Sequence, residues 1–285
     1  MGGFFHRHRG VTPYVLLVPG VLWLAVFFLV PLAFLGYESL RSGLFPNFEF
    51  TWEFSNFSNG IRDYHEQLVR SFVYAGIATV ACLVLAYPLV YWIAFRAGPW
   101  RNLFLLFIVA PFFVTYLVRT LAWLNILADQ GPVVSILKEL HILGPDGRLL
   151  ATTFAVVSGI TYNFFPFMAL PIYVSLEQID ERLIEAAKDL YASSTQAFLR
   201  VTLPLSAPGI VAGTLLTFIP AAGDFINAAL LGTPQQAMIG NVIQAKFLES
   251  LDYPGAASLS FILMGLILVA LLVYARIVGS ERLTG

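Results

Sequence analysis

One polar segment stands out in this chain: Asp180–Pro208, with the sequence DERLIEAAKDLYASSTQAFLRVTLPLSAP. Long apolar segments flank it on both sides. Asp180 is the expected N-cap of a first short helix that runs to about Leu190. This helix has one apolar face, at i, i+3, i+4 and i+7 spacing, and one charged face: Leu183, Ala186, Ala187 and Leu190 against Glu181, Arg182, Glu185, Lys188 and Asp189.

A second short helix is expected to follow directly. Ser193 and Gln196 have the spacing of a capping box, which predicts a helix start at Ser193. Pro204 lacks a backbone donor and is expected to end this helix, and Pro208 is placed where a new helix begins. An amphipathic helix pair between two membrane spans has little to pack against within its own loop. The pattern therefore favours docking to another protein; an ordinary amphipathic loop on the membrane surface is the alternative.

The order Glu185-Ala186-Ala187, a turn, and then Leu203-Pro204 resembles the EAA loop of the membrane subunits of ABC importers. That resemblance implies that residues 178–208 form a coupling helix that docks into a cytoplasmic ATPase. The family usually has Gly where this chain has Tyr191, and Gly permits a positive φ in the turn. Tyr at that position either costs strain or forces a different turn. The residues that the resemblance assigns to coupling are Glu185, Ala186, Ala187, Asp189, Tyr191, Leu203 and Pro204.

The composition identifies an integral membrane protein. Of the 285 residues, 58% are hydrophobic and only 12% are charged, against about 25% charged residues in a soluble globular chain. The net charge of −1 gives no reason to expect a nucleic-acid partner. The sequence has one cysteine and no cluster of histidines or carboxylates with metal-ligand spacing, so we expect neither a disulfide nor a metal site.

The apolar segments predict an all-α protein with six transmembrane helices, since each is near the roughly 20 residues needed to cross a bilayer. We expect a tail at 1–12, a permease domain at 13–278 and a tail at 279–285. The third span is interrupted by Pro111. The expected spans are Pro13–Leu35, Leu68–Phe95, Asn102–Leu127, Leu150–Leu176, Gly209–Leu231 and Ala256–Val278.

The basic residues predict the orientation of these spans. The side that holds both termini and the polar segment carries more of them, so the positive-inside rule places it in the cytoplasm. The opposite side has more carboxylates than cations, which would concentrate cationic solutes weakly. Its aromatic-rich stretch, residues 45–57, predicts an interfacial belt or a landing surface for a partner. The two basic sets are Arg7, Arg9, Arg96, Arg101, Arg182, Lys188, Arg200, Arg276 and Arg282 against Arg41, Arg62, Arg70, Lys138, Arg148 and Lys246.

Two ionisable residues lie inside predicted spans: Arg119 in the third and Asp224 in the fifth. Ionised side chains in a bilayer normally face a partner or a watery cavity. Counted from the cytoplasmic ends, both are at a similar depth, so they can form a structural ion pair. Alternatively, Asp224 is the counter-ion of a cationic substrate and Arg119 neutralises it or sets its geometry. Polar and aromatic neighbours at helical spacing complete the candidate substrate pathway: Tyr116, Trp123, Tyr162, Asn163 and Asn227.

The stretches around Arg119 and Asp224 resemble the PotB-like permeases of spermidine/putrescine importers, and this resemblance spans nearly the whole chain from Pro13. It implies the type I importer architecture in a bacterial inner membrane, and a polyamine as substrate. The implied partners are a second, PotC-like permease, two copies of a cytoplasmic ATPase and an extracytoplasmic binding protein. No GxxxxGK[ST] phosphate loop occurs, so the chain is expected to be a transport subunit without enzymatic activity, with ATP and magnesium bound by the partner ATPase.

Other functions stay open at this point. The same architecture in related subgroups imports anions or ferric iron, and in the anion case Arg119 would grip the substrate. A secondary transporter that uses Asp224 as a proton or sodium site would need no ATPase, but it would leave the amphipathic segment unexplained. A membrane receptor or scaffold would leave both ionisable residues with structural roles only.

Overall fold

The computed structural model describes residues 12–280, and its regular secondary structure is helical apart from one short antiparallel hairpin. The predicted tails, 1–12 and 279–285, lie outside these residues except for Thr12, Gly279 and Ser280. The strands are β1 (Arg41–Leu44) and β2 (Asn47–Phe50). The helices are α2 (Thr12–Leu24), α3 (Val30–Ser39), α4 (Ser55–Arg96), α5 (Arg101–Val109), α6 (Tyr116–Leu127), α7 (Pro132–Glu139), α8 (Thr153–Glu177), α9 (Glu181–Asp189), α10 (Ser194–Ala197), α11 (Leu203–Ala222), α12 (Ile226–Leu231), α13 (Ile239–Leu248) and α14 (Tyr253–Ser280).

The chain divides into two compact units. The first comprises residues up to 63 and 245–262, and the second comprises 64–244 and 263 onward. In the first unit, a π-helical turn (Ala25–Leu29) joins α2 to α3, and the hairpin follows. Asn56 holds the hairpin to the start of α4, because its Nδ2 donates to the carbonyls of Ser39 (3.0 Å) and Arg41 (2.9 Å).

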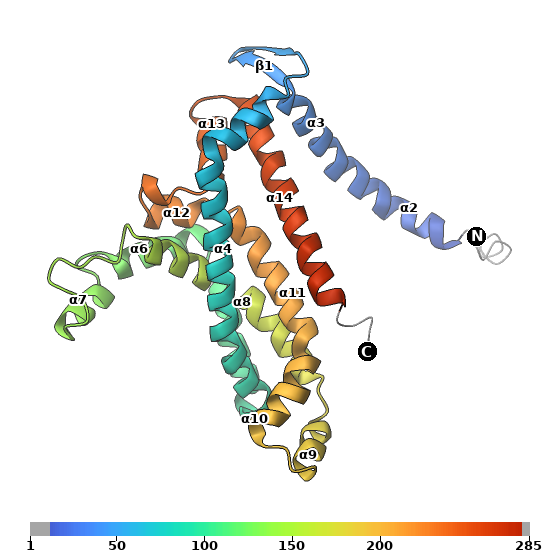
Figure 1. Cartoon of the computed structure of the whole chain (residues 1–285), viewed down its shortest axis with the longest axis vertical. Coiled ribbons are helices and arrows are strands. Elements are labelled where there is room, and N and C mark those ends of the chain that lie inside the picture. The colour runs from blue at the N-terminus through green and yellow to red at the C-terminus, as the bar shows by residue number, and fades with distance from the viewer. Residues whose placement is uncertain (1–11, 281–285) are drawn as a thin grey trace. The chain divides into compact units, whose positions relative to one another are not determined.

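The second unit is built around α8, which packs along α4 and α11 (Figure 1). Small residues permit the close approach of α8 and α11. A Cβ added to Gly209 would lie 2.4 Å from the carbonyl oxygen of Pro171, and one added to Gly213 would lie 2.9 Å from the Met168 sulfur. Packing of small residues replaces the hydrophobic effect as the main attraction between helices in a bilayer. The contact therefore depends on these glycines.

Most of the predicted spans correspond to helices that are long enough to cross a membrane. Among the described residues, five are long and apolar enough to cross a bilayer: Leu17–Ser39, Ser55–Arg96, Thr153–Glu177, Ser194–Ala222 and Tyr253–Ile277. A sixth exists if the bent pair Gly98–Phe113 and Tyr116–Glu139 is one span. The helical fold class and the count of six agree with this architecture.

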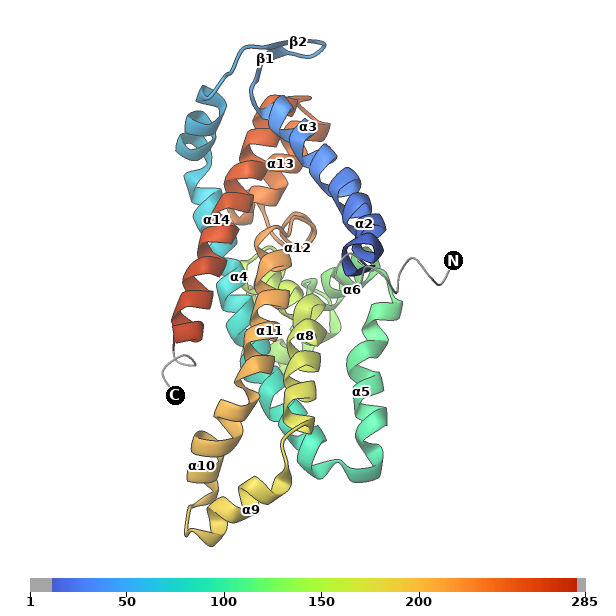
Figure 2. The ribbon, with the colours of Figure 1, turned by 90° about the vertical axis from the view of Figure 1, so that its right-hand side faces the viewer.

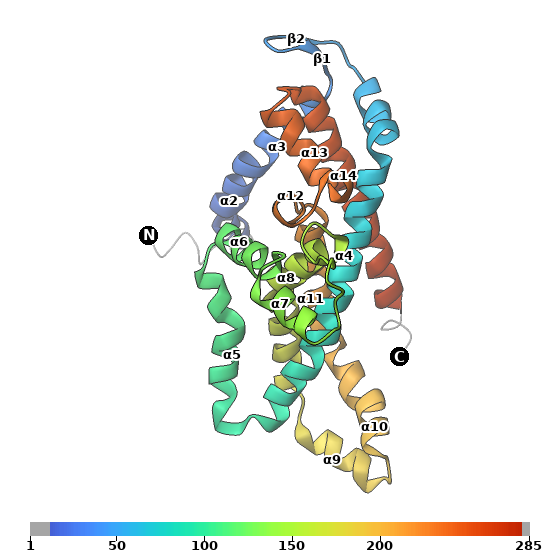
Figure 3. The ribbon, with the colours of Figure 1, turned by 90° about the vertical axis from the view of Figure 1, so that its left-hand side faces the viewer.

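The third span, predicted as Asn102–Leu127 with an interruption at Pro111, consists of two separate helices. After α5 the chain forms a 3-10 turn (Ala110–Phe113), becomes extended, and resumes as α6 at an angle of 98° (Figure 3). Pro111 lies in that turn and cannot donate a backbone hydrogen bond to continue α5. The interruption predicted at Pro111 is therefore a break of the whole span.

The fifth span is also broken, which was not predicted from the sequence. The predicted helix Gly209–Leu231 is α11 followed by a non-helical turn at residues 223–225 and then the short helix α12. Pro220 lies near the end of α11, and Gly223 ends it. Both breaks expose backbone polar groups inside the apolar part of the molecule, where side chains have to satisfy them.

The segment between α8 and α11 contains both predicted helix starts (Figure 2). Asp180 caps α9 and accepts from the backbone N–H of Arg182 (3.0 Å), and Ser193 caps α10 in the predicted capping box. The prediction that Pro204 ends the second helix is wrong. α10 continues through a π-helical turn, Phe198–Thr202, into α11. The wider π-turn directly before Pro204 accommodates the missing donor, so the helix passes through it.

Candidate functional site

The two broken spans place polar side chains at one point beside α8. α6 begins at Tyr116, immediately after the first break, and α12 begins two residues after Asp224, which lies within the second. Residues that are far apart in the sequence become neighbours there. Asp224 (6% exposed), Asn163 (1%) and Asn227 (0%) are buried together with Thr120 (0%). Unwound backbone between half-helices is a recurrent form of binding site in membrane transporters.

Asp224 is held by several donors from this chain. The hydroxyl of Tyr116 and the Nδ2 of Asn227 (2.6 Å) both donate to its Oδ2. Its Oδ1 accepts from the backbone N–H of Asn227 at 3.0 Å, which satisfies a first-turn donor of α12. These bonds fix the orientation of the carboxylate.

Asn227 extends this network to α6 and α8. Its Nδ2 also lies 2.6 Å from the Tyr116 hydroxyl, and its Oδ1 accepts from Asn163 Nδ2 at 3.3 Å. Asn163 Nδ2 donates in addition to Thr120 Oγ1 (3.2 Å). The structure thus joins Tyr116, Asn163, Asp224 and Asn227, all predicted site residues, in one network. Thr120 was not among them, although its place one turn after Tyr116 was a signal that could have identified it.

Arg119 is buried (7% exposed) but does not pair with Asp224. The predicted ion pair is absent among the described residues: no carboxylate there lies within 4.0 Å of its guanidinium. The guanidinium lies instead over the rings of Phe112 (5.4 Å) and Tyr116 (5.6 Å). Its Nε and Nη1 are buried without a hydrogen-bond partner. Cation–π contacts replace the expected salt bridge.

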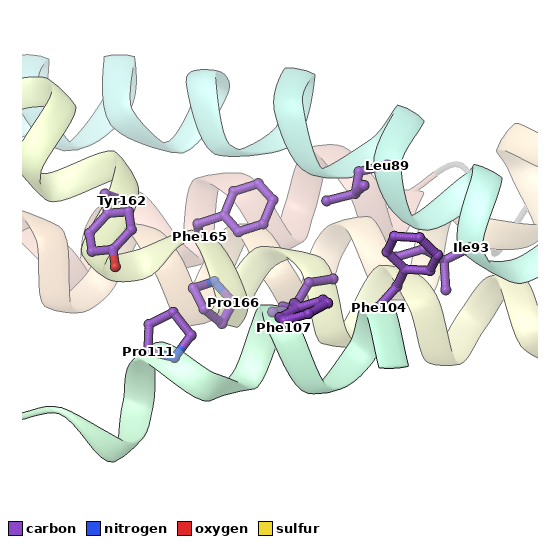
Figure 4. Close-up of a pocket in the computed structure, with 9 residues that line it drawn as sticks. Leu89, Ile93, Phe104, Phe107, Pro111, Tyr162, Phe165 and Pro166 are labelled. Atoms are coloured by element: carbon purple, nitrogen blue, oxygen red, sulfur yellow. The ribbon is translucent and has the colours of Figure 1, made fainter. Parts of the chain in front are cut away.

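Two pockets adjoin the site. A small one, of about 190 Å³, is lined by Tyr116, Phe164 and Asp224 with the residues of the second break. Trp123 and Tyr162, the remaining predicted pathway residues, contact each other edge to face with ring centroids 5.6 Å apart. Tyr162 lines a second, larger pocket of about 390 Å³ (Figure 4). The predicted pathway residues therefore divide between a polar network and an aromatic pair.

The segment between α8 and α11 presents an unpartnered surface. The apolar residues Leu183 and Leu190 are exposed (49% and 82%), as are Glu185, Ala186 and Asp189. Ala187 and Leu203 are half-buried, and Pro204 is exposed. We call the exposed surface formed by Leu183, Glu185, Ala186, Leu190 and Tyr191, from both sides of α9 and its turn, the coupling face, after the role that the sequence predicts for this segment.

Tyr191 adopts a backbone conformation that glycine reaches without strain. Its φ is +61°, in the left-handed region, and its side chain is 98% exposed. The N–H of Ala192 donates to Ala187 O (3.1 Å) and the N–H of Tyr191 to Lys188 O (2.9 Å), the pattern of a Schellman motif. Of the two predicted outcomes, strain and a different turn, the structure has the first. A left-handed non-glycine residue costs about 1–2 kcal/mol.

The long apolar helices and the broken spans are those of a multi-pass membrane protein. Residues 61–280 match the binding-protein-dependent transport system inner membrane component family, and the chain belongs to it. It is 37% identical over 265 residues to the spermidine/putrescine transport system permease protein PotB of Haemophilus influenzae, with 92% of this chain and 88% of that protein covered. PotB of Escherichia coli (strain K12) is 39% identical over 213 residues, covering 75% of this chain and 78% of that protein.

Solved structures agree on the fold. A bacterial ABC transporter that imports the acidic polysaccharide alginate has a chain with a TM-score of 0.75, covering 99% of this chain and 98% of that one at 17% identity. The MetNI methionine ABC transporter gives 0.57 at 18% identity, with 77% and 94% covered. The protein is therefore a multi-pass inner-membrane permease of the ABC importer class, a transport subunit that works with partner subunits.

Proposed function

We propose that this permease imports polyamines such as spermidine and putrescine and forms half of the translocation pathway. The similarity to PotB over most of the chain carries the proposal. The other half comes from a second, PotC-like permease, and an extracytoplasmic binding protein delivers the substrate. The termini and the segment 178–208 lie in the cytoplasm, as the distribution of basic residues favours.

Asp224 is the proposed counter-ion for the alkylammonium groups of the substrate. It borders a pocket whose walls include the rings of Tyr116 and Phe164. A carboxylate beside aromatic faces suits alkylammonium through charge-assisted and cation–π contacts. Tyr116, Asn163 and Asn227 position the carboxylate, and Arg119 limits the net negative charge of the site. Trp123 and Tyr162 offer further aromatic surface along the pathway.

The coupling face is the proposed contact with the ATPase. Glu185 acts as its anchor, Ala186 and Ala187 permit close approach, and Asp189, Tyr191, Leu203 and Pro204 shape the loop. Two ATPase subunits bind ATP and magnesium, and their closure and opening alternate the access of the cavity. The exposed Leu183 and Leu190 support this role, because large apolar side chains on a polar loop mark interaction sites.

One observation favours a second candidate function. Arg119 is buried with two unpartnered nitrogens, which suits the import of an anion that the guanidinium would bind. Ferric iron is a third candidate substrate for the same architecture, and secondary transport would instead use Asp224 as the ion site. The exposed coupling face speaks for ATP-driven import over secondary transport.

The test is the ATPase activity of the reconstituted transporter with its binding protein. We expect spermidine or putrescine to stimulate hydrolysis, and sulfate and ferric iron to leave it at the basal rate. Stimulation by sulfate alone would favour the import of an anion, with Arg119 as the residue that binds it. Hydrolysis that no solute changes, together with uptake driven by an ion gradient, would overturn ATP-driven import.

A further inference from the structure

The larger of the two pockets is an apolar groove between α4, α5 and α8 (Figure 4). It has a volume of about 390 Å³. From Phe104 to Pro111 it follows α5 over a length of about 10 Å, at 1.5 Å per residue. The Tyr162 hydroxyl is the one polar side-chain group among its lining residues, which are otherwise aliphatic, aromatic or proline. The groove therefore suits a hydrocarbon chain and offers nothing to a charged solute.

One end of the groove has two arginines. Arg96 follows the lining residue Ile93 by three positions on α4, and Arg101 precedes Phe104 by three positions on α5. Residues three apart share a helix face, so both arginines lie one turn beyond the apolar lining. Arg101 pairs with Glu177 and lies over the Tyr173 ring (5.5 Å). Arg96 is exposed, and no acceptor pairs with it in the part of the chain that the structure describes.

Two exposed tryptophans flank these arginines. Trp92 is 43% exposed and Trp100 is 64% exposed. Tryptophan concentrates at the level of lipid headgroups, where an amphipathic ring has one apolar and one wet side. The turn at residues 97–100 thus has the composition of a membrane interface, with the apolar groove extending from it toward the bilayer core. In a bilayer, this arrangement would place Arg96 at the level of the phosphates of the lipid headgroups.

We propose that this groove binds an anionic phospholipid, with one acyl chain along Phe104, Phe107 and Phe165 and the phosphate on Arg96. The unpaired guanidinium supplies the charge complementarity, and the groove accounts for the hydrocarbon. Basic residues at the cytoplasmic end of grooves between membrane helices are a general form of anionic-lipid site. The bound lipid fixes the end of α5 against α4 and α8.

Native mass spectrometry of the full chain, titrated with phosphatidylglycerol and phosphatidylcholine, tests the proposal. We expect selective retention of phosphatidylglycerol. Arg96→Gln should lower it about fivefold, the effect of one basic residue at an anionic membrane surface, and Arg96→Lys should restore most of it. Leu89→Trp, which fills the groove and leaves Arg96 intact, should also lower retention.

Arg276→Gln is the matched control, because Arg276 is exposed on α14 and does not line this groove. An equal loss of phosphatidylglycerol retention in the Arg276 variant would mean that any exposed positive charge attracts the lipid, and it would overturn the proposed site. Competition by glycerol phosphate would identify a site for free phosphate instead. The same titration on the assembled transporter distinguishes a lipid from a protein as the occupant of the groove. If no lipid is retained there and the second permease cross-links to the Trp100→Cys variant, a subunit covers the groove and the lipid site is overturned.

Discussion

Tyr116 contacts two ionisable residues that do not contact each other. Its hydroxyl donates to Asp224, and its ring lies under the guanidinium of Arg119. Each of the two side chains is thus held inside the apolar region by neutral groups and not by the other. The ion pair predicted from the sequence is absent, although both residues contact Tyr116, because the guanidinium lies over the rings of Phe112 and Tyr116. The break at 223–225 moves Asp224 to the start of α12.

Asp224→Asn is the direct test of the substrate contact. The amide keeps the shape of the side chain but removes the charge that the alkylammonium group requires. We expect polyamine uptake to fall at least about thirtyfold, since loss of a buried charge partner costs about 2–5 kcal/mol. Radiolabelled uptake in vesicles measures this, with thermal unfolding as the control. Normal uptake combined with a lower unfolding temperature would leave Asp224 with a structural role only.

Tyr191→Gly should retain coupling and relieve the left-handed strain of about 1–2 kcal/mol. Glycine also has more conformational freedom in the unfolded chain, so the net gain in stability is smaller than the strain. Thermal unfolding and co-purification with the ATPase would measure the two effects. A large loss of the complex would contradict this expectation and give the tyrosine ring a docking role of its own.

At the scale of elements, α9 carries the charge that we assign to docking. Glu185→Lys should leave ATP hydrolysis intact and reduce import to near background, because the reversed charge disturbs the ATPase contact but touches nothing in the membrane. The matched control is Glu139→Lys, an exposed glutamate at the end of α7. Import at the normal rate in the Glu185 variant would refute its role as an anchor.

The contact between α8 and α11 gives a prediction about stability. Gly209→Ala places a methyl group within 2.4 Å of Pro171 O and 2.6 Å of Ser175 Oγ, so the helices have to separate. Overpacking of this kind costs about 1–3 kcal/mol. Gly76→Ala on α4 meets nothing within 4 Å and should be neutral or slightly stabilising. Unfolding in detergent compares the two, and equal effects would show that the close approach carries no energy.

The sequence predicted those features of these elements that depend only on residues close together in the chain. The caps at Asp180 and Ser193 were predicted because each requires only residues within three positions. The π-turn before Pro204 and the break at residues 223–225 were missed, because a proline within an apolar run is compatible with either a continuous or an interrupted helix. Tyr116, Asn163, Asp224 and Asn227 were predicted as candidates, but the bonds among them required the three-dimensional structure.

At the scale of the whole molecule, exposed apolar surface dominates. In the first unit, none of the most apolar window of Leu17–Ser39 is buried within the chain. Trp23 and Phe28 are more than 60% exposed there. Soluble monomers rarely expose contiguous apolar surface of this extent. It fits a subunit whose solvent is lipid and whose remaining contacts come from the partners that its family requires. The composition predicted this environment before any helix was placed.

The close packing of α8 against α11 makes these two helices a rigid pair. The coupling face lies at one end of the pair, in the loop that connects the two helices, and Asp224 directly follows the other end of α11. The backbones of the two helices approach closely at Gly209 and Gly213, so the contact between them has little free volume and is hard to deform. We therefore expect a displacement of the connecting loop to move α8 and α11 together, and the non-helical turn at residues 223–225 directly follows the far end of α11.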